Sequence, residues 1–267
     1  MTKNSIAQIG RQWLTLVMIL MAIAVNGVSN VFPPAGKNTG EVSNITLGGV
    51  LITPAGYAFA IWGLIYLGLI AYGIYQALPA QRHQRAFEQV SWAIIGACVL
   101  QIIWIYVFLT YHFWWAAAII LGITGCLIAA YLPTRQLKPT RKIRWFLQAP
   151  ISIYFAWITI ASVLNVSGAL YVVAVPRDAI STFESSVATT SPGGVIATVA
   201  MMCISAGIAA IVALRYADVS YPAVAVWAFI AITVRTGFAP IAFSGIALAV
   251  GLSIVIARIK LSPRPTS

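Results

Sequence analysis

Long apolar runs separated by short polar stretches are the feature that most limits how this chain can fold. About 20 apolar residues are enough to cross the hydrocarbon core of a bilayer as a helix. The sequence holds eight candidates, the seventh of them short, at residues 12–31, 54–78, 91–109, 114–132, 145–166 (or as far as 175), 195–214, 221–234 and 239–257. Because lipid cannot hydrogen-bond the backbone, we expect an all-α integral membrane protein with about eight transmembrane helices.

The composition excludes the main soluble classes. Of the 267 residues, 61% are hydrophobic and only 8% are charged, whereas soluble domains carry about 25% charged residues. This excludes a soluble enzyme and a nucleic-acid-binding module, although the net charge is +11. The three cysteines each lie inside an apolar run and form no CxxC pair, so no metal site is predicted.

The basic residues predict the orientation in the membrane, because lysine and arginine accumulate in cytoplasmic loops. With the N-terminus inside, all 16 basic residues except Lys37, Arg177 and Arg235 fall on the cytoplasmic side. We therefore expect both termini in the cytoplasm, and a bacterial cytoplasmic membrane as the location. The first apolar run also resembles a signal peptide, but no clean cleavage site follows it, so we expect a retained helix.

Aromatic residues divide the chain. Every tryptophan except Trp227 lies in the first five apolar runs or beside them, whereas alanine, valine, isoleucine and glycine dominate the last three. We expect a five-helix membrane domain at residues 1–175, a polar extracytoplasmic loop at 176–194 and a three-helix extension at 195–267. Small residues recur every fourth position in the fourth, sixth and eighth runs, which is typical of helix-packing faces.

Three of the predicted helices gather aromatic and amide side chains within a narrow arc, at 100° per residue. An uncharged amide in an apolar helix should face the interior of the bundle. These arcs form either a packed aromatic core or a ligand cavity, and both interpretations remain open. The residues are Phe59, Trp62, Tyr66 and Gly73 on the second helix, Gln101, Trp104 and Phe108 on the third, and Tyr154, Trp157, Ala161 and Asn165 on the fifth.

No catalytic constellation is visible in the sequence. All five acidic residues fall in loops or at helix ends, and there is no Ser/His/Asp grouping, HExxH or P-loop. We therefore expect no catalytic residue and no enzymatic activity. Intramembrane acids mark proton-coupled transport, so their absence disfavours that mechanism but not passive transport.

Three stretches resemble the tryptophan-rich sensory protein family, also known as TspO or the peripheral-type benzodiazepine receptor family. They are "TPAGYAFAIWGLIYLGLIAYGIYQALP" at 53–79, "LQIIWIYVFL" at 100–109 and "YFAWITIASVLN" at 154–165. The resemblance covers residues 12 to 170. The family's loop tryptophan is Tyr57 here, its third-helix asparagine is Gln101, and this chain adds three C-terminal helices.

The resemblance implies a membrane sensor, receptor or carrier for a planar hydrophobic ligand, such as a porphyrin, a haem-like molecule or a sterol. No cofactor is required, and the expected partners are the bilayer and this ligand, with a homodimer left open. Alternatives are a passive transporter or channel for a small solute, and an assembly partner of a membrane complex. Val166, Tyr171 and Arg177 also fit a loose sterol motif, for which chance is the favoured explanation. The expected ligand-binding residues are Tyr57, Phe59, Trp62, Tyr66, Gln101, Trp104, Phe108, Tyr154, Trp157, Ala161 and Asn165.

Overall fold

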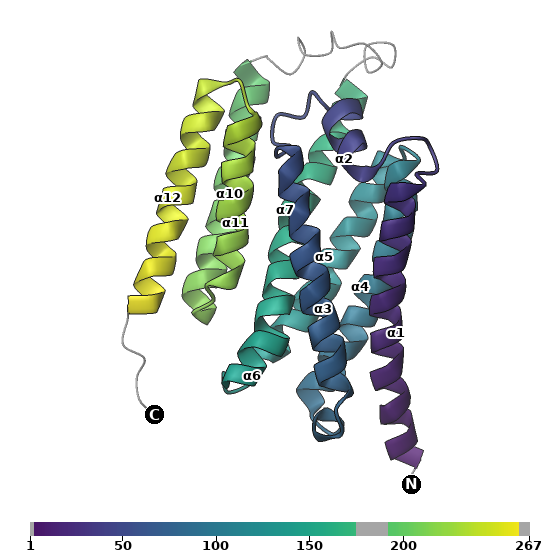
Figure 1. Ribbon diagram of the computed structural model, residues 1–267. Coiled ribbons are helices and arrows are strands. Elements are labelled where there is room, and N and C mark those ends of the chain that lie inside the picture. Colours follow the sequence, from purple (N-terminus) through teal and green to yellow (C-terminus); the bar gives the residue numbers. More distant parts are fainter. Residues whose placement is uncertain (1–2, 175–191, 262–267) are drawn as a thin grey trace. The chain divides into compact units, whose positions relative to one another are not determined.

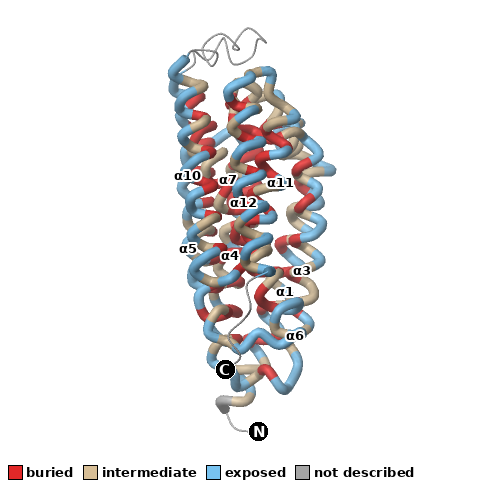
Figure 2. The backbone as a smooth tube through the Cα atoms, turned by 90° about the vertical axis from the view of Figure 1, so that its left-hand side faces the viewer, coloured by how far each residue is buried: buried red, intermediate tan, exposed pale blue. Residues whose placement is uncertain are grey.

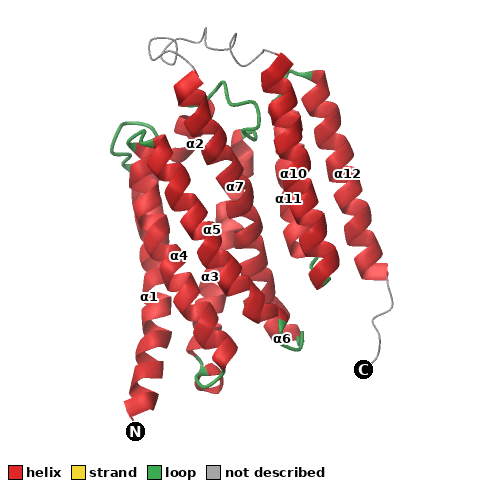
Figure 3. Ribbon diagram, turned by 180° about the vertical axis from the view of Figure 1, so that it is seen from behind, coloured by secondary structure: helices red, strands yellow, loops and turns green. Residues whose placement is uncertain are grey.

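The computed structural model describes residues 3–174 and 192–261, and the regular structure in these ranges is helical (Figures 1 and 3). Two short helices, α2 (Thr39–Glu41) and α6 (Arg141–Ile143), accompany the long ones. The long helices are α1 (Lys3–Val31), α3 (Ile61–Ala77), α4 (Arg85–Leu109), α5 (Phe113–Arg135), α7 (Ala149–Ala174), α10 (Pro192–Tyr216), α11 (Ser220–Arg235) and α12 (Ala239–Leu261).

The predicted all-α architecture is confirmed for the described residues. Seven helical segments are long and apolar enough to cross a membrane, and α11 is a shorter apolar helix of 16 residues. These eight segments coincide with the eight predicted runs. The last two predicted runs are separate helices with a short connection, because α11 ends at Arg235 and α12 begins at Ala239.

The chain divides into two compact units, which are described separately. The first unit comprises Met1–Val42 and Ala60–Ile158, and the second comprises Ser43–Phe59 and Thr159–Ser267. The loop predicted at residues 176–194 lies outside the described residues as far as residue 191, and the predicted division of the chain around it remains a prediction.

Close helix packing forms the first unit. Helix α4 lies along α5, and α1 packs against both α3 and α4. Small residues bring the backbones together: a Cβ on Gly68 would lie 3.1 Å from Pro150, and one on Gly96 would lie 3.2 Å from the Cys126 sulfur. The buried stripes of these helices alternate with exposed ones in Figure 2, as expected for helices with one face toward protein and one toward lipid.

A buried polar network ties α1 to α3 in the same unit. Gln12 and Gln76 are each at most 1% exposed. Gln12 Nε2 donates to the Gln76 carbonyl at 2.6 Å, and Gln76 Nε2 donates back to the Gln12 carbonyl at 2.7 Å. Gln12 Nε2 also caps the end of α3 by donating to the Leu78 carbonyl at 3.1 Å. Ser91 on α4 extends the network to Gln76 Oε1 at 3.4 Å.

Helices α10, α11 and α12 pack together in the second unit and are coloured green to yellow in Figure 1. The small residues Ser205, Ala209 and Ala213 of α10 are all buried, so this ladder is an internal packing face. On α12, a Cβ at Gly245 would overlap the Thr233 hydroxyl of α11. On α12 the ladder is covered only in part, because Ala249 is buried whereas Ser253 and Ala257 are exposed.

Candidate ligand-binding site

The first unit brings together four of the predicted site residues from three helices. The Trp62 ring of α3 lies 5.4 Å from Tyr66 and 6.1 Å from Tyr154 of α7, between ring centroids. Tyr154 in turn donates from its hydroxyl to Gln101 Oε1 of α4 at 3.5 Å, at the long limit of a hydrogen bond. We call Trp62, Tyr66, Gln101 and Tyr154 the aromatic–amide cluster.

Two polar atoms of this cluster are buried without a hydrogen-bond partner: Gln101 Nε2 and the Tyr66 hydroxyl. Gln101 as a whole is only 4% exposed. A buried donor left unpaired costs about 1–3 kcal/mol. The cluster therefore leaves one amide donor and one hydroxyl without a partner in the protein.

A second ring group lies on α4 and at the start of α5. Trp104 and Phe108 stack at 4.9 Å with their planes 17° apart, and Phe108 meets Phe113 edge-on at 5.8 Å. Trp157 of α7, one turn from Tyr154, is 2% exposed. In both groups the predicted rings contact one another, so a flat ligand would have to part them.

The remaining predicted residues belong to the second unit. Tyr57 and Phe59 lie in the short 3-10 helix Gly56–Ala60, which leads directly into α3. Asn165 is buried on α7, and its Nδ2 donates to the Ala161 carbonyl one turn earlier at 2.8 Å. Of the sterol motif, Tyr171 is buried, and Arg177 lies outside the described residues.

The segment Ser43–Phe59, which we call the first loop, is held by Arg235 at the end of α11. The guanidinium donates three hydrogen bonds to carbonyls of this loop: to Gly48 at 2.9 Å, to Val50 at 3.2 Å and to Thr53 at 3.2 Å. Hydrogen bonds from a charged donor are worth roughly twice neutral ones. Arg235 therefore holds the middle of the first loop, between the π-helix Val42–Thr46 and the 3-10 helix Gly56–Ala60, against the end of α11.

Trp227 lies about two turns before Arg235 on α11 and holds the C-terminal end of the same loop. Its indole nitrogen donates to the Ala58 carbonyl at 3.2 Å, and its ring meets Tyr57 edge-on at 5.3 Å. A backbone bond from Ala55 to the Ala231 carbonyl at 3.0 Å joins the loop to α11 between these anchors. We call Arg235 and Trp227 the loop anchors.

Sequence reasoning missed both anchors. Arg235 counted only as one of three outward basic residues, and Trp227 only as the exception to the tryptophan distribution. The available signal was that a single tryptophan and a single arginine stand at 227 and 235, two turns apart on an apolar helix. An isolated tryptophan and an isolated arginine on an apolar helix suggest hydrogen bonds to another segment of the protein, because both side chains end in N–H donors.

Replacing Gly49 with alanine should destabilise the first loop. A Cβ at this position would lie 2.5 Å from the Tyr171 hydroxyl and 2.7 Å from its ring, so the loop or the ring must move. We expect a fall in melting temperature of a few degrees, on the order of 1–3 kcal/mol for overpacking. Thermal unfolding of Gly49→Ala and of Gly49→Ala/Tyr171→Leu checks this, since the smaller side chain should restore the lost stability; equal melting temperatures for Gly49→Ala and the wild type would contradict it.

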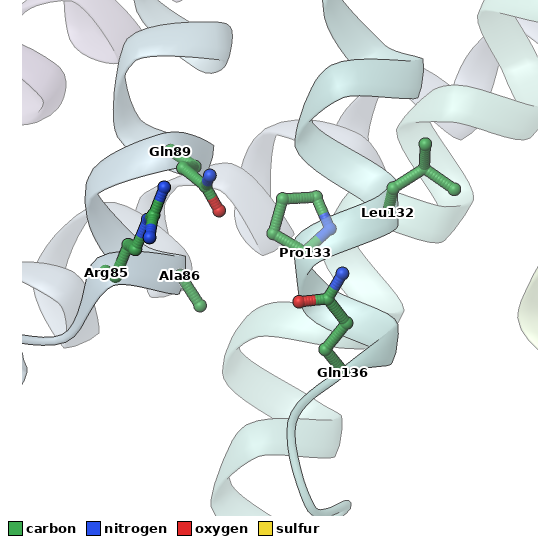
Figure 4. Close-up of a pocket in the computed structure, with 6 residues that line it drawn as sticks. All are labelled: Arg85, Ala86, Gln89, Leu132, Pro133 and Gln136. Carbon is green, nitrogen blue, oxygen red and sulfur yellow. The ribbon is translucent and has the colours of Figure 1, made fainter.

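A separate cavity of about 350 Å³ lies in the first unit, between the start of α4 and the end of α5 (Figure 4). In the close-up, Arg85 and Gln89 face Pro133 and Gln136 across the opening. None of the predicted site residues lines it. The lining is completed by Ala86 and Leu132.

The eight apolar helices of residues 3–174 and 192–261, with their buried amides and aromatic clusters, define a polytopic helical membrane protein. The sequence model of the TSPO-like protein family matches residues 12–258, and the chain belongs to that family. The match extends well past residue 170 and includes α10, α11 and α12, which carry the loop anchors. No curated protein and no solved structure matches the chain.

Proposed function

We propose that this integral membrane protein is a receptor or carrier for a planar hydrophobic ligand of the tetrapyrrole or sterol type. The observation that carries the proposal is the pair of unpartnered polar atoms, Gln101 Nε2 and the Tyr66 hydroxyl, buried beside the Trp62 and Tyr154 rings. A tetrapyrrole supplies what this cluster lacks: a flat π-surface for the rings and polar atoms for the amide and hydroxyl.

Each contact with the ligand would contribute a modest binding free energy, and several contacts would act together. Each ring that stacks on the ligand contributes about 0.5–1.5 kcal/mol beyond the burial of its area. A hydrogen bond to Gln101 adds about 1 kcal/mol and removes the cost of the unpaired donor. Binding also costs energy, because rings that now contact one another must separate. We expect the ligand to enter at Trp62, because this tryptophan is only half-buried.

The loop charges also indicate how the protein is oriented in the membrane. We infer that both termini face the cytoplasm, in a bacterial cytoplasmic membrane, because the basic residues are distributed so unevenly among the loops. Tyr57, Phe59, Trp104, Phe108, Trp157, Ala161 and Asn165 stay proposed ligand-binding residues alongside the aromatic–amide cluster.

The test is a titration of the purified full-length protein, in non-ionic detergent, with protoporphyrin IX. Binding is followed in the Soret absorbance of the porphyrin, so that a tryptophan variant does not change the reporter. We expect saturable binding by the wild type. Trp62→Ala and Gln101→Leu should each weaken it about tenfold, the factor that corresponds to 1.4 kcal/mol.

Trp92→Ala is the matched control, because Trp92 lies on α4 but is 53% exposed. It should bind as the wild type does. Absence of saturable binding, or equal affinities for the wild type, Trp62→Ala and Gln101→Leu, would overturn the proposal. The same titration with a fluorescent sterol separates the two ligand classes.

A further inference from the structure

An arginine without a charge partner is buried in the first unit, near the end of α3. Arg11 of α1 is only 4% exposed. Its Nη2 donates to the Arg82 carbonyl at 3.1 Å, whereas Nε and Nη1 are buried and have no hydrogen-bond partner. Arg11 thus forms no salt bridge with any residue that the structure describes.

The surroundings of Arg11 are polar but not acidic. Arg82 adds a second guanidinium, whose Nε donates to Gln12 Oε1 at 3.2 Å. Gln12 also donates to carbonyls at the end of α3, where the partial negative charge of that helix offsets part of the two positive charges. Gln8, one turn before Arg11, has a buried Oε1 that is itself unpartnered.

A buried arginine that contacts a second, half-buried arginine only through its backbone carbonyl is expensive without an anion. Burial of an unpaired charge costs several kcal/mol, and the half charge at a helix end compensates only part of one. Guanidinium N–H groups match the oxygens of a phosphate group in number and spacing. Nη2 carries two N–H groups, and one of them donates a hydrogen bond to the Arg82 carbonyl. The other N–H can bind an anion together with the N–H of Nε or of Nη1, as a bidentate pair of hydrogen bonds.

We propose that Arg11 and Arg82 bind one phosphate-type oxyanion at this end of the first unit. Arg11 lies about two turns inside the candidate span that begins at Ser5, which is close to the depth of lipid headgroups. Arg82 is only half-buried, so an anion can reach its side chain from the surface. The phosphate belongs either to an anionic lipid or to free inorganic phosphate, and the experiment separates these sources.

The experiment measures thermal unfolding of the full-length protein in non-ionic detergent, with sodium phosphate replacing sodium chloride at constant ionic strength. A parallel series adds phosphatidylglycerol or phosphatidylcholine to the micelles. We expect the melting temperature of the wild type to rise with the logarithm of the phosphate concentration above the dissociation constant, by about 5 °C or more at a hundredfold excess. A rise with inorganic phosphate identifies a free anion as sufficient, and a rise with phosphatidylglycerol alone identifies the lipid.

Two variants and one control make the result specific. Arg11→Gln should lose the response, and it should melt at or above the wild-type temperature without phosphate because the unpaired charge is gone. Arg82→Gln, at a half-buried position, should need about tenfold more phosphate. Arg141→Gln, an exposed basic residue of the same unit, should respond as the wild type does.

The alternative is that Arg11 is satisfied by Gln8 after a small side-chain rotation and has only a structural role. In that case the wild type does not respond to inorganic phosphate or to phosphatidylglycerol, and Arg11→Gln melts lower under all conditions. Either finding overturns the proposed site, as does an Arg11→Gln response equal to that of the wild type. None of these outcomes depends on porphyrin binding.

Discussion

Replacing Arg235 with glutamine is expected to lower the melting temperature by roughly 6–12 °C and to release the first loop. The change removes a guanidinium that donates to the carbonyls of Gly48, Val50 and Thr53. Hydrogen bonds to charged groups contribute about 1.5–3 kcal/mol each, and three from one side chain are not additive, so we expect a loss of about 3 kcal/mol. Each kcal/mol corresponds to about 2–4 °C in a protein of this size.

Thermal unfolding and limited chymotrypsin digestion measure this effect. The loop contains Tyr57 and Phe59, which the protease should reach sooner once the loop is free. Arg235→Lys should fall between the wild type and Arg235→Gln, because an ammonium is a point charge that cannot span three carbonyls as the planar guanidinium does. Arg144→Gln, at an exposed position, controls for the loss of one positive charge; if it melts and digests like Arg235→Gln, the anchoring role is wrong.

Replacing Gln12 with leucine should cost about 3 kcal/mol, the second large effect. The leucine cannot donate to the Gln76 and Leu78 carbonyls, which then remain unpaired at the end of α3. It also removes the acceptor of Arg82 Nε. Buried groups left unsatisfied cost about 1–3 kcal/mol each, partly offset by the greater burial of an apolar side chain.

The measurement is again thermal unfolding, with Gln89→Leu as the matched control. Gln89 is exposed on α4, so the same chemical change there should shift the melting temperature by less than about 2 °C. A Gln12→Leu protein that is as stable as Gln89→Leu would show that the buried amide pair does not hold α1 to α3.

The helical architecture could be predicted from the sequence because a single physical requirement dominates it. A segment in lipid must be apolar and long, and both properties are local, so the eight runs located the helices well. The end of α11 at Arg235 and the start of α12 at Ala239 were also predictable, since a charge and a glycine interrupt the apolar pattern there.

The helical period predicted which aromatic residues share a face, but not what that face contacts. It grouped Trp62 with Tyr66 correctly, yet it could not show that Trp62 would lie against Tyr154 from another helix. Nor could it tell a ring that faces a cavity from a ring that packs against its neighbour, because both need the same residue types at the same spacing.

Long-range polar contacts were beyond the sequence for a different reason. Arg11 and Arg235 were both counted as charges that set the orientation, and counting treats every basic residue alike. Whether an arginine is solvated, buried or bound to carbonyls depends on residues far away in the chain. Arg235 reaches carbonyls 182 to 187 positions earlier, and no local pattern contains that information.

This separation along the chain has a consequence for biosynthesis. Ribosomes add about 5–20 residues per second, so roughly 10–40 s pass between translation of the first loop and translation of its anchor. During that interval the loop has no Arg235 or Trp227 to bind. The first loop therefore acquires its final conformation only after α11 has been made, and in a nascent chain arrested before α11 the loop should remain unanchored.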